Sequence, residues 1–170
     1  MRTTSILSLL IAAAAGFVLS ISQPNVAAHC QVPCGIYDDP MRITMLREDA
    51  TTIAKAVDSV VELMDGAPNP VAMNQVVRWT TTKDEAATNI QRIVSDYFLT
   101  QRVKAVPAGE AGHEAYLDQL AKMHAVLVAA MKCKQTVDPA AVATLEAAIE
   151  AIAPMYVHEH SHDHDHSHGG

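Results

Sequence analysis

The architecture of this chain can be inferred from residues 39–68, which read DPMRITMLREDATTIAKAVDSVVELMDGAP. An Asx-Pro pair opens the segment, and such a pair puts a capping side chain just before a proline suited to the first helical turn. Apolar residues then recur mainly at helical spacings, at Leu46, Ile53, Val57, Val60, Val61 and Met64. A Gly-Ala-Pro sequence ends the run. The segment therefore predicts an amphipathic helix with one buried face.

Three further runs have the same organisation. Asn69-Pro70 and Asp138-Pro139 mark two more helix starts of this kind. The core residues expected in these runs are Met73, Val76, Val77, Ile90, Val94, Tyr97 and Phe98, then Tyr116, Leu117, Leu120, Leu127 and Met131, and finally Val142, Leu145, Ile149 and Ile152. No strand pattern is evident. Four amphipathic helices with mostly short connections predict an all-α fold, an antiparallel four-helix bundle.

Residues 1–28 have the features of a cleaved secretory signal peptide. Arg2 gives a positive start, an apolar run extends from Ile6 to Leu19, and small residues ending at Ala28 occupy the cleavage positions. A retained N-terminal anchor is the alternative, but the run is shorter than the roughly 20 residues of a membrane span. We expect cleavage between Ala28 and His29, export to the periplasm or the extracellular space, and no membrane attachment after processing.

The charge of the chain limits its partners. The 170 residues carry a formal net charge of −7, and loss of residues 1–28 removes only one basic residue, which makes the net charge −8. This balance argues against nucleic acid or an anionic membrane surface as a partner. An anionic substrate would have to be attracted locally, within a Debye length of roughly 8–10 Å.

The segment HCQVPCGIY, residues 29–37, differs from the rest of the chain in its chemistry. Cys30 and Cys34 are four apart, which is neither the CxxC spacing of thioredoxin-like redox sites nor the usual zinc-ribbon pair. Pro33 fixes a turn before the second cysteine, and Gly35 permits a sharp change of direction after it. The chain can therefore bring both sulfurs to one point.

Cleavage before His29 would add further donors at this point. The new α-amine has a reference pKa of about 8, so a metal can displace its proton. The amine, the amide nitrogen of Cys30 and the sulfurs of Cys30 and Cys34 can lie in one plane, with the His29 imidazole as an axial ligand. Square-planar nitrogen and sulfur donors favour Ni(II) or Cu(II) over zinc. If the metal is nickel, such strong donors bring Ni(III) within reach.

The motif HCxxPCGxY at a processed N-terminus resembles the nickel hook of the nickel superoxide dismutases, and SDYF at residues 95–98 extends the resemblance. It implies a four-helix bundle that assembles as a homohexamer and converts superoxide, a small anion, to oxygen and hydrogen peroxide. It also implies one nickel ion per subunit, which is bound by His29, Cys30 and Cys34 and alternates between Ni(II) and Ni(III).

The resemblance further implies roles for two tyrosines. Tyr37 and Tyr97 match residues that line the approach to the metal, where they admit a small anion and order a water or a proton donor. A core position is the alternative for Tyr97. Gln31 stands where some members have Asp, which alters the surroundings of the hook. Leu99 stands where some members have a lysine, so one source of local attraction for superoxide is absent.

Other residues give weaker signals. An acid–arginine pair orients the axial imidazole in the family, and Glu48 and Arg78 are the candidates here. His124 shares an apolar helix face and is expected to be a buried neutral histidine rather than a ligand. Cys133 ends the third helix and is expected to be a structural or spectator thiol. The charged cluster Lys83–Glu85 is expected to be a solvated helix face.

Residues 157–170 form a C-terminal tail in which histidine occupies every second position. These histidines are His158, His160, His162, His164, His166 and His168. The composition cannot bury a core, so the tail is expected to be disordered. Clustered imidazoles bind nickel, zinc and copper, which predicts a labile metal reservoir; a merely solubilising tail is the alternative. Nickel delivery to the hook of the same or a neighbouring subunit is a hypothesis.

Three hypotheses about function follow. The first is an enzyme, a superoxide dismutase in which residues 29–156 form the hook and the bundle. The second is an exported carrier for nickel, zinc or copper that uses both the hook and the tail. The third is a structural bundle with a Cys30–Cys34 disulfide, because three cysteines in an exported chain can also mean one disulfide and one spare thiol.

Overall fold

The computed structural model describes residues 38–67 and 69–157. Its long helices are α2 (Asp39–Asp65), α3 (Pro70–Arg92), α4 (His113–Gln135) and α5 (Pro139–Ile152). The chain continues from α3 into a π-helical segment, η1 (Ile93–Arg102), and a short 3-10 turn, η2 (Ala153–Met155), follows α5. These residues contain no strand, and the expected all-α fold is confirmed. None of the described helices has the length and apolarity needed to cross a membrane.

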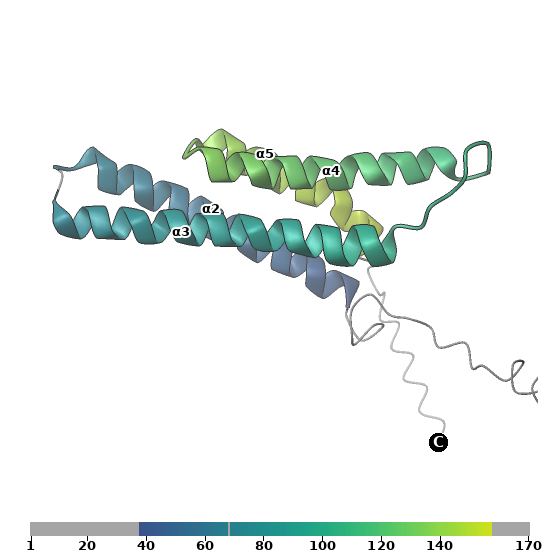
Figure 1. Ribbon diagram of the computed structural model, residues 1–170, viewed down its shortest axis with the longest axis horizontal. Coiled ribbons are helices and arrows are strands. Elements are labelled where there is room, and N and C mark those ends of the chain that lie inside the picture. Colours follow the sequence, from purple (N-terminus) through teal and green to yellow (C-terminus); the bar gives the residue numbers. More distant parts are fainter. Residues whose placement is uncertain (1–37, 68, 158–170) are drawn as a thin grey trace, which may run out of the picture.

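The four helices form an antiparallel bundle (Figure 1). α2 contacts α3 and α5, and α4 contacts the same two helices, so the contacts close into a ring. Short turns join α2 to α3 and α4 to α5, and a longer connection joins η1 to α4. As a result, the start of α2, the end of η1 and the end of α5 lie at one end of the bundle (Figure 1).

Two of the three expected Asx-Pro caps are present. The Asn69 side chain accepts a hydrogen bond from the backbone N–H three residues later, at 2.9 Å, and the Asp138 side chain accepts one from the N–H two residues later, also at 2.9 Å. The third pair behaves differently. Asp38 is the N-cap of α2 and makes no side-chain capping bond, and Asp39 lies inside the first turn. Its carboxylate is therefore available for another purpose.

The buried face of α4 differs from the predicted one. It consists of Met123, Val126, Ala129, Ala130 and Cys133. His124 lies on the exposed side, so its predicted burial was wrong, and Leu117 and Met131 are also exposed. Apolar residues occupy most of the circumference of α4, so spacing alone could not select a face. The interior uses the side with the smaller residues, which lets neighbouring helices approach closely.

The α2–α3 hairpin extends beyond the turn between α4 and α5 (Figure 1). Four residues expected in the core lie toward its tip and are exposed instead, namely Val61, Met64, Met73 and Val77. Their helical spacing was read correctly, but none of the other helices that the structure describes covers them. The buried core lies where all four helices overlap.

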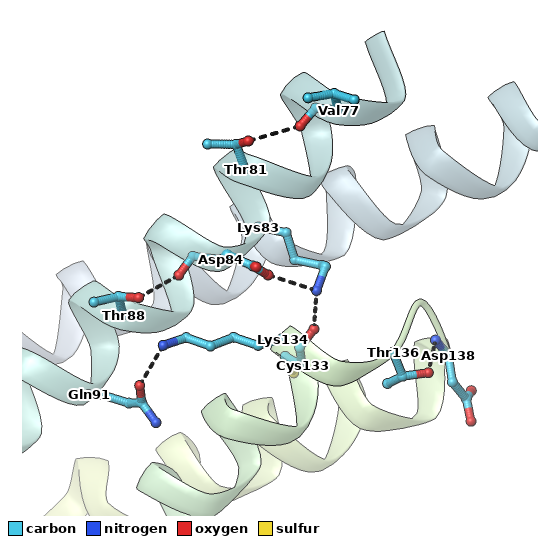
Figure 2. Close-up of polar contacts among 10 residues, drawn as sticks. All are labelled: Val77, Thr81, Lys83, Asp84, Thr88, Gln91, Cys133, Lys134, Thr136 and Asp138. Atoms are coloured by element: carbon cyan, nitrogen blue, oxygen red, sulfur yellow. Dashed lines mark hydrogen bonds and ion pairs between the residues drawn. The ribbon is translucent and has the colours of Figure 1, made fainter. Parts of the chain in front are cut away.

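Lys83 was expected on a solvated helix face, and this expectation was wrong because its side chain is only 2% exposed. Its Nζ donates hydrogen bonds to the backbone carbonyl oxygen of Cys133 and to the carboxylate of Asp84 (Figure 2). Cys133 itself is buried, as expected for a structural thiol, and its Sγ lies 3.4 Å from the carbonyl oxygen of Ala141. Burial raises the pKa of this thiol, which keeps it protonated and unreactive.

Candidate metal centre

The expected metal ligands lie outside the described residues. This holds for His29, Cys30 and Cys34, for Tyr37, and for the six histidines of the tail. Within residues 38–67 and 69–157, no group of three or more His, Cys, Asp or Glu side chains is arranged to hold a metal ion. The described part of the site therefore begins at Asp38, directly after Tyr37, and consists of what surrounds the start of α2.

Asp39 is the centre of a polar network at this point. Its Oδ1 accepts a hydrogen bond from the hydroxyl of Tyr97, and its Oδ2 accepts one from the guanidinium of Arg102 at 2.5 Å. A single carboxylate thus holds two residues of η1. This contact joins the helix that follows the HCQVPCGIY segment to the segment that carries Tyr97.

The winding of η1 explains why both residues face Asp39. Tyr97 and Arg102 are five apart, and in an α-helix with about 3.6 residues per turn they would be rotated by roughly 140° from each other. In a π-helix, hydrogen bonds join residues five apart, so such residues share a face. The hydroxyl of Thr100 and the N–H of Val103 bond in this way to carbonyls five residues earlier, at 2.6 and 2.9 Å.

The Tyr97 ring belongs to the core, while its hydroxyl reaches the edge of the bundle. The residue is 6% exposed. Its ring packs edge-to-face on Phe98, with 5.2 Å between centroids, and the Arg42 guanidinium lies 5.3 Å from its centroid. A core position for Tyr97 and a role for its hydroxyl near the metal site are therefore compatible. The ring stabilises the interior through packing, and the hydroxyl remains available for polar contacts.

The surroundings keep the Tyr97 hydroxyl protonated. Burial raises its pKa to about 12, and the hydrogen bond to Asp39 together with the charge of that carboxylate acts in the same direction. Arg102 and Arg42 oppose this shift, because positive charges favour the phenolate. At neutral pH the hydroxyl is thus a hydrogen-bond donor whose proton points at Asp39.

Two arginines supply positive charge beside Tyr97. Leu99, at the position where a lysine was considered, is half-buried and packs against the core. Arg42 on α2 and Arg102 on η1 lie beside the tyrosine instead. Neither arginine was predicted from the sequence pattern. A signal did exist for Asp39, since two adjacent aspartates precede Pro40 directly after the HCQVPCGIY segment.

Glu48 and Arg78 are not brought together. The Asn89 amide donates a hydrogen bond to the carboxylate of Asp49 at 2.6 Å, which fixes the register of α2 against α3. Because Glu48 is next to Asp49 in the sequence, it lies at the same height along the bundle as Asn89. Arg78 is eleven residues before Asn89 on α3, which at about 1.5 Å per residue puts it about 16 Å further along the bundle.

A comparison with protein families identifies the class of the chain. Residues 24–160 match the family described as nickel-containing superoxide dismutase, a span that includes the HCQVPCGIY segment and the bundle. The protein is thus a metal-dependent oxidoreductase. The chain belongs to the nickel-containing superoxide dismutases, with nickel as its cofactor and superoxide as its substrate. Searches of the curated proteins and of the solved structures found no match.

Proposed function

We propose that His29, Cys30 and Cys34 bind the nickel ion, at an N-terminus exposed by cleavage after Ala28. An amine, an amide nitrogen and two thiolates suit square-planar Ni(II). The family match begins before these residues, at residue 24, so it includes all of them. Nickel held there would supply one-electron chemistry between Ni(II) and Ni(III), which is suited to oxidising one superoxide and reducing a second one. The family match over the ligand motif carries this part of the proposal.

The proposed role of Tyr97 is carried by the hydrogen bond from its hydroxyl to Asp39. Asp39 lies two residues after Tyr37 in the sequence, so the Tyr97 hydroxyl contacts the first helical turn after the HCQVPCGIY segment. The Tyr97 hydroxyl donates its hydrogen bond to Asp39, so the role left for the Tyr97 oxygen is to accept a hydrogen bond from a water. In this role Tyr97 orders the water that carries protons to the developing peroxide, and Tyr37 is its expected partner.

Arg42 and Arg102 take the role of attracting superoxide. Without residues 1–28, the chain has a formal net charge of −8 and repels an anion at long range. The two guanidinium groups beside Tyr97 act within the Debye length of roughly 8–10 Å, where the distant negative charges are screened. The Asp39 carboxylate that pairs with Arg102 offsets part of this positive charge, so the attraction is local and modest.

Export and assembly complete the proposal. Residues 1–28 direct the chain to the periplasm or the extracellular space, and the mature chain assembles as a homohexamer. Support for assembly comes from the exposed apolar residues of the α2–α3 hairpin, such as Val61, Met64 and Val77. Large apolar side chains left exposed on one hairpin are consistent with a surface that a second copy covers. Sedimentation of the mature protein measures the subunit number.

The histidine tail is proposed to hold nickel for the hook. Tyr156, one residue before the last described residue, Val157, packs its ring 4.5 Å from that of Phe98. Phe98 in turn contacts Tyr97, which bonds Asp39. Residues 158–170 therefore follow a point that lies at the same end of the bundle as the start of α2.

The test uses the full chain, expressed with residues 1–28 in a host that exports it and in the presence of nickel. We expect a mature chain that begins at His29, contains one nickel ion in the hook and consumes superoxide. Cys30→Ser and Cys34→Ser should abolish the Ni(III) paramagnetic resonance signal and the turnover of superoxide, whereas nickel bound by the histidine tail should remain. Cys133→Ala, which changes the buried thiol outside the site, should keep both the signal and the turnover. A chain that starts elsewhere and is still active contradicts the ligand set, and a nickel-loaded chain without turnover indicates a carrier.

A further inference from the structure

We propose that Asp39 is a positioning residue for Tyr97, and that its carboxylate fixes the direction of the tyrosine hydroxyl. This inference rests on the proposed role of Tyr97 in the reaction. The observation that carries it is the contact of the Asp39 carboxylate with both Tyr97 and Arg102 of the π-helical segment η1. Asp39 lies in the first turn of α2, the helix that follows the HCQVPCGIY segment.

Both oxygens of the carboxylate are engaged, and by different residues. Oδ1 accepts from Tyr97 and Oδ2 accepts from Arg102, while the Asp39 side chain is only 17% exposed. A carboxylate with one partner can rotate about its terminal torsion, which is broad. A carboxylate held from both sides cannot rotate without breaking a charge-assisted hydrogen bond. Arg102 therefore fixes Asp39, and Asp39 fixes the Tyr97 hydroxyl.

The side chain of Asp39 does not perform the task that its position in the sequence suggests. Asn69 and Asp138 precede prolines in the same way, and both cap their helices through their side chains. At the start of α2 no side-chain capping bond forms, although an aspartate cap stabilises a helix by about 1 kcal/mol. The carboxylate is committed to η1 instead. A role in holding Tyr97 accounts for this difference, whereas a purely local role in helix formation does not.

The test compares Asp39→Asn with Asp49→Asn in the nickel-loaded, processed chain. Asp49 is a matched control, because its carboxylate also joins α2 to a neighbouring element, through Asn89. It lies ten residues further along α2, about 15 Å away. Titration of tyrosine carbons by NMR, assigned with Tyr97→Phe, reports directly on the hydroxyl. Nickel content and the rhombic Ni(III) paramagnetic resonance signal report on the metal site.

We expect Asp39→Asn to lower the pKa of Tyr97 from about 12 toward the ordinary value of 10.0, because a negative neighbour is lost. Nickel content should be unchanged, and kcat/KM should fall by at least about tenfold, because the hydroxyl is no longer held in place. Asp39→Glu should restore part of kcat/KM. Asp49→Asn should change neither the pKa of Tyr97 nor kcat/KM. Equal losses in Asp39→Asn and Asp49→Asn, or an unaltered Tyr97 titration, would overturn the proposal.

A second variant covers poor folding of Asp39→Asn. Arg102→Gln changes a side chain that is 47% exposed and removes a positive charge, so it should raise the pKa of Tyr97 while lowering turnover. The proposal is supported if the pKa of Tyr97 falls in Asp39→Asn and rises in Arg102→Gln while both variants lose turnover. If the pKa of Tyr97 moves in the same direction in both variants, the proposal is contradicted. If the unmodified chain lacks nickel at its N-terminus, the proposed function fails, whereas the tyrosine titration still decides whether Asp39 holds Tyr97.

Discussion

Lys83 on α3 donates a hydrogen bond from Nζ to the backbone carbonyl oxygen of Cys133 on α4, at 2.5 Å (Figure 2). The last carbonyls of a helix have no partner within it, and Cys133 lies in the final turn of α4. A buried ammonium thus satisfies a buried helix end, and Asp84 lies 3.0 Å away to balance its charge. The pair links two helices that the sequence separates by fifty residues.

Lys83→Met should reduce the free energy of unfolding by about 1–3 kcal/mol, because a buried carbonyl loses its only strong donor. Urea unfolding followed by circular dichroism measures this loss. Lys55→Met is the control, since Lys55 is exposed on α2, and a surface change of this kind stays within about 0.5 kcal/mol. Equal effects of the two substitutions would show that the buried bond contributes little.

Glu150→Gln should make the bundle less sensitive to acid. Arg47 on α2 and Glu150 on α5 form a two-pronged pair, with both nitrogen–oxygen distances at 2.7 Å. The hydrogen bond from Arg47 lowers the pKa of Glu150 below its usual 4.5. The pair therefore stabilises the fold above that pH, and the stabilisation is lost as the pH falls through the lowered value.

The size of this effect is small, because both side chains are about half exposed, and such pairs contribute less than about 1 kcal/mol. Unfolding free energies at pH 7 and pH 3 should differ less in Glu150→Gln than in the unmodified chain. Glu146→Gln, an exposed change one helical turn earlier, should leave the difference as it was. The idea fails if both variants respond to acid alike.

Tyr97 should make the fold sensitive to alkali. Its pKa is raised from 10.0 to about 12 in the folded chain, so between these values the unfolded chain releases a proton that the folded chain keeps. Stability is therefore complete below pH 10 and falls as the pH rises toward 12. Tyr97→Phe keeps the ring packing on Phe98 and should remove part of this loss. Thermal unfolding from pH 8 to 11 tests it, with Tyr116→Phe as the control.

Deletion of residues 158–170 should lower nickel loading when nickel is scarce and leave the activity of fully loaded protein alone. The physical reason is local concentration, because six imidazoles follow a point at the same end of the bundle as the start of α2. Nickel content is measured after growth in limiting and in ample nickel. A tail with serine at the six histidine positions separates metal binding from solubility. Equal loading in scarce nickel would defeat the hypothesis.

Much of the fold followed from local patterns. α2 and α5 begin at Asx-Pro pairs and bury apolar residues at helical spacing, and both facts are visible in the sequence. The inner face of α4 was not predictable, because apolar residues surround that helix and only the packing of its neighbours selects a side. Lys83 was missed for a similar reason. A charge is expected in water unless a partner is known, and its partner lies on another helix.

The site was predictable where its chemistry is local and not where it depends on tertiary contacts. The ligand motif and the candidate role of Tyr97 came from short patterns. Asp39 was taken for a helix cap, because nothing in its neighbourhood reveals Tyr97 and Arg102, about sixty residues away. The change from α to π winding in η1 also has no sequence signature. It depends on which hydrogen bonds the rest of the bundle favours.

The wide winding of η1 has a consequence at the level of the gene. Loss of one codon between those for Phe98 and Arg102 would let the segment relax to ordinary α-helical geometry. The arginine would then follow Tyr97 by four positions, and residues four apart share a face of an α-helix, so the arginine would still face Asp39. Gain of one residue would instead place the arginine six positions after Tyr97, on a different face of the helix. In this stretch a one-residue deletion should therefore be tolerated better than a one-residue insertion.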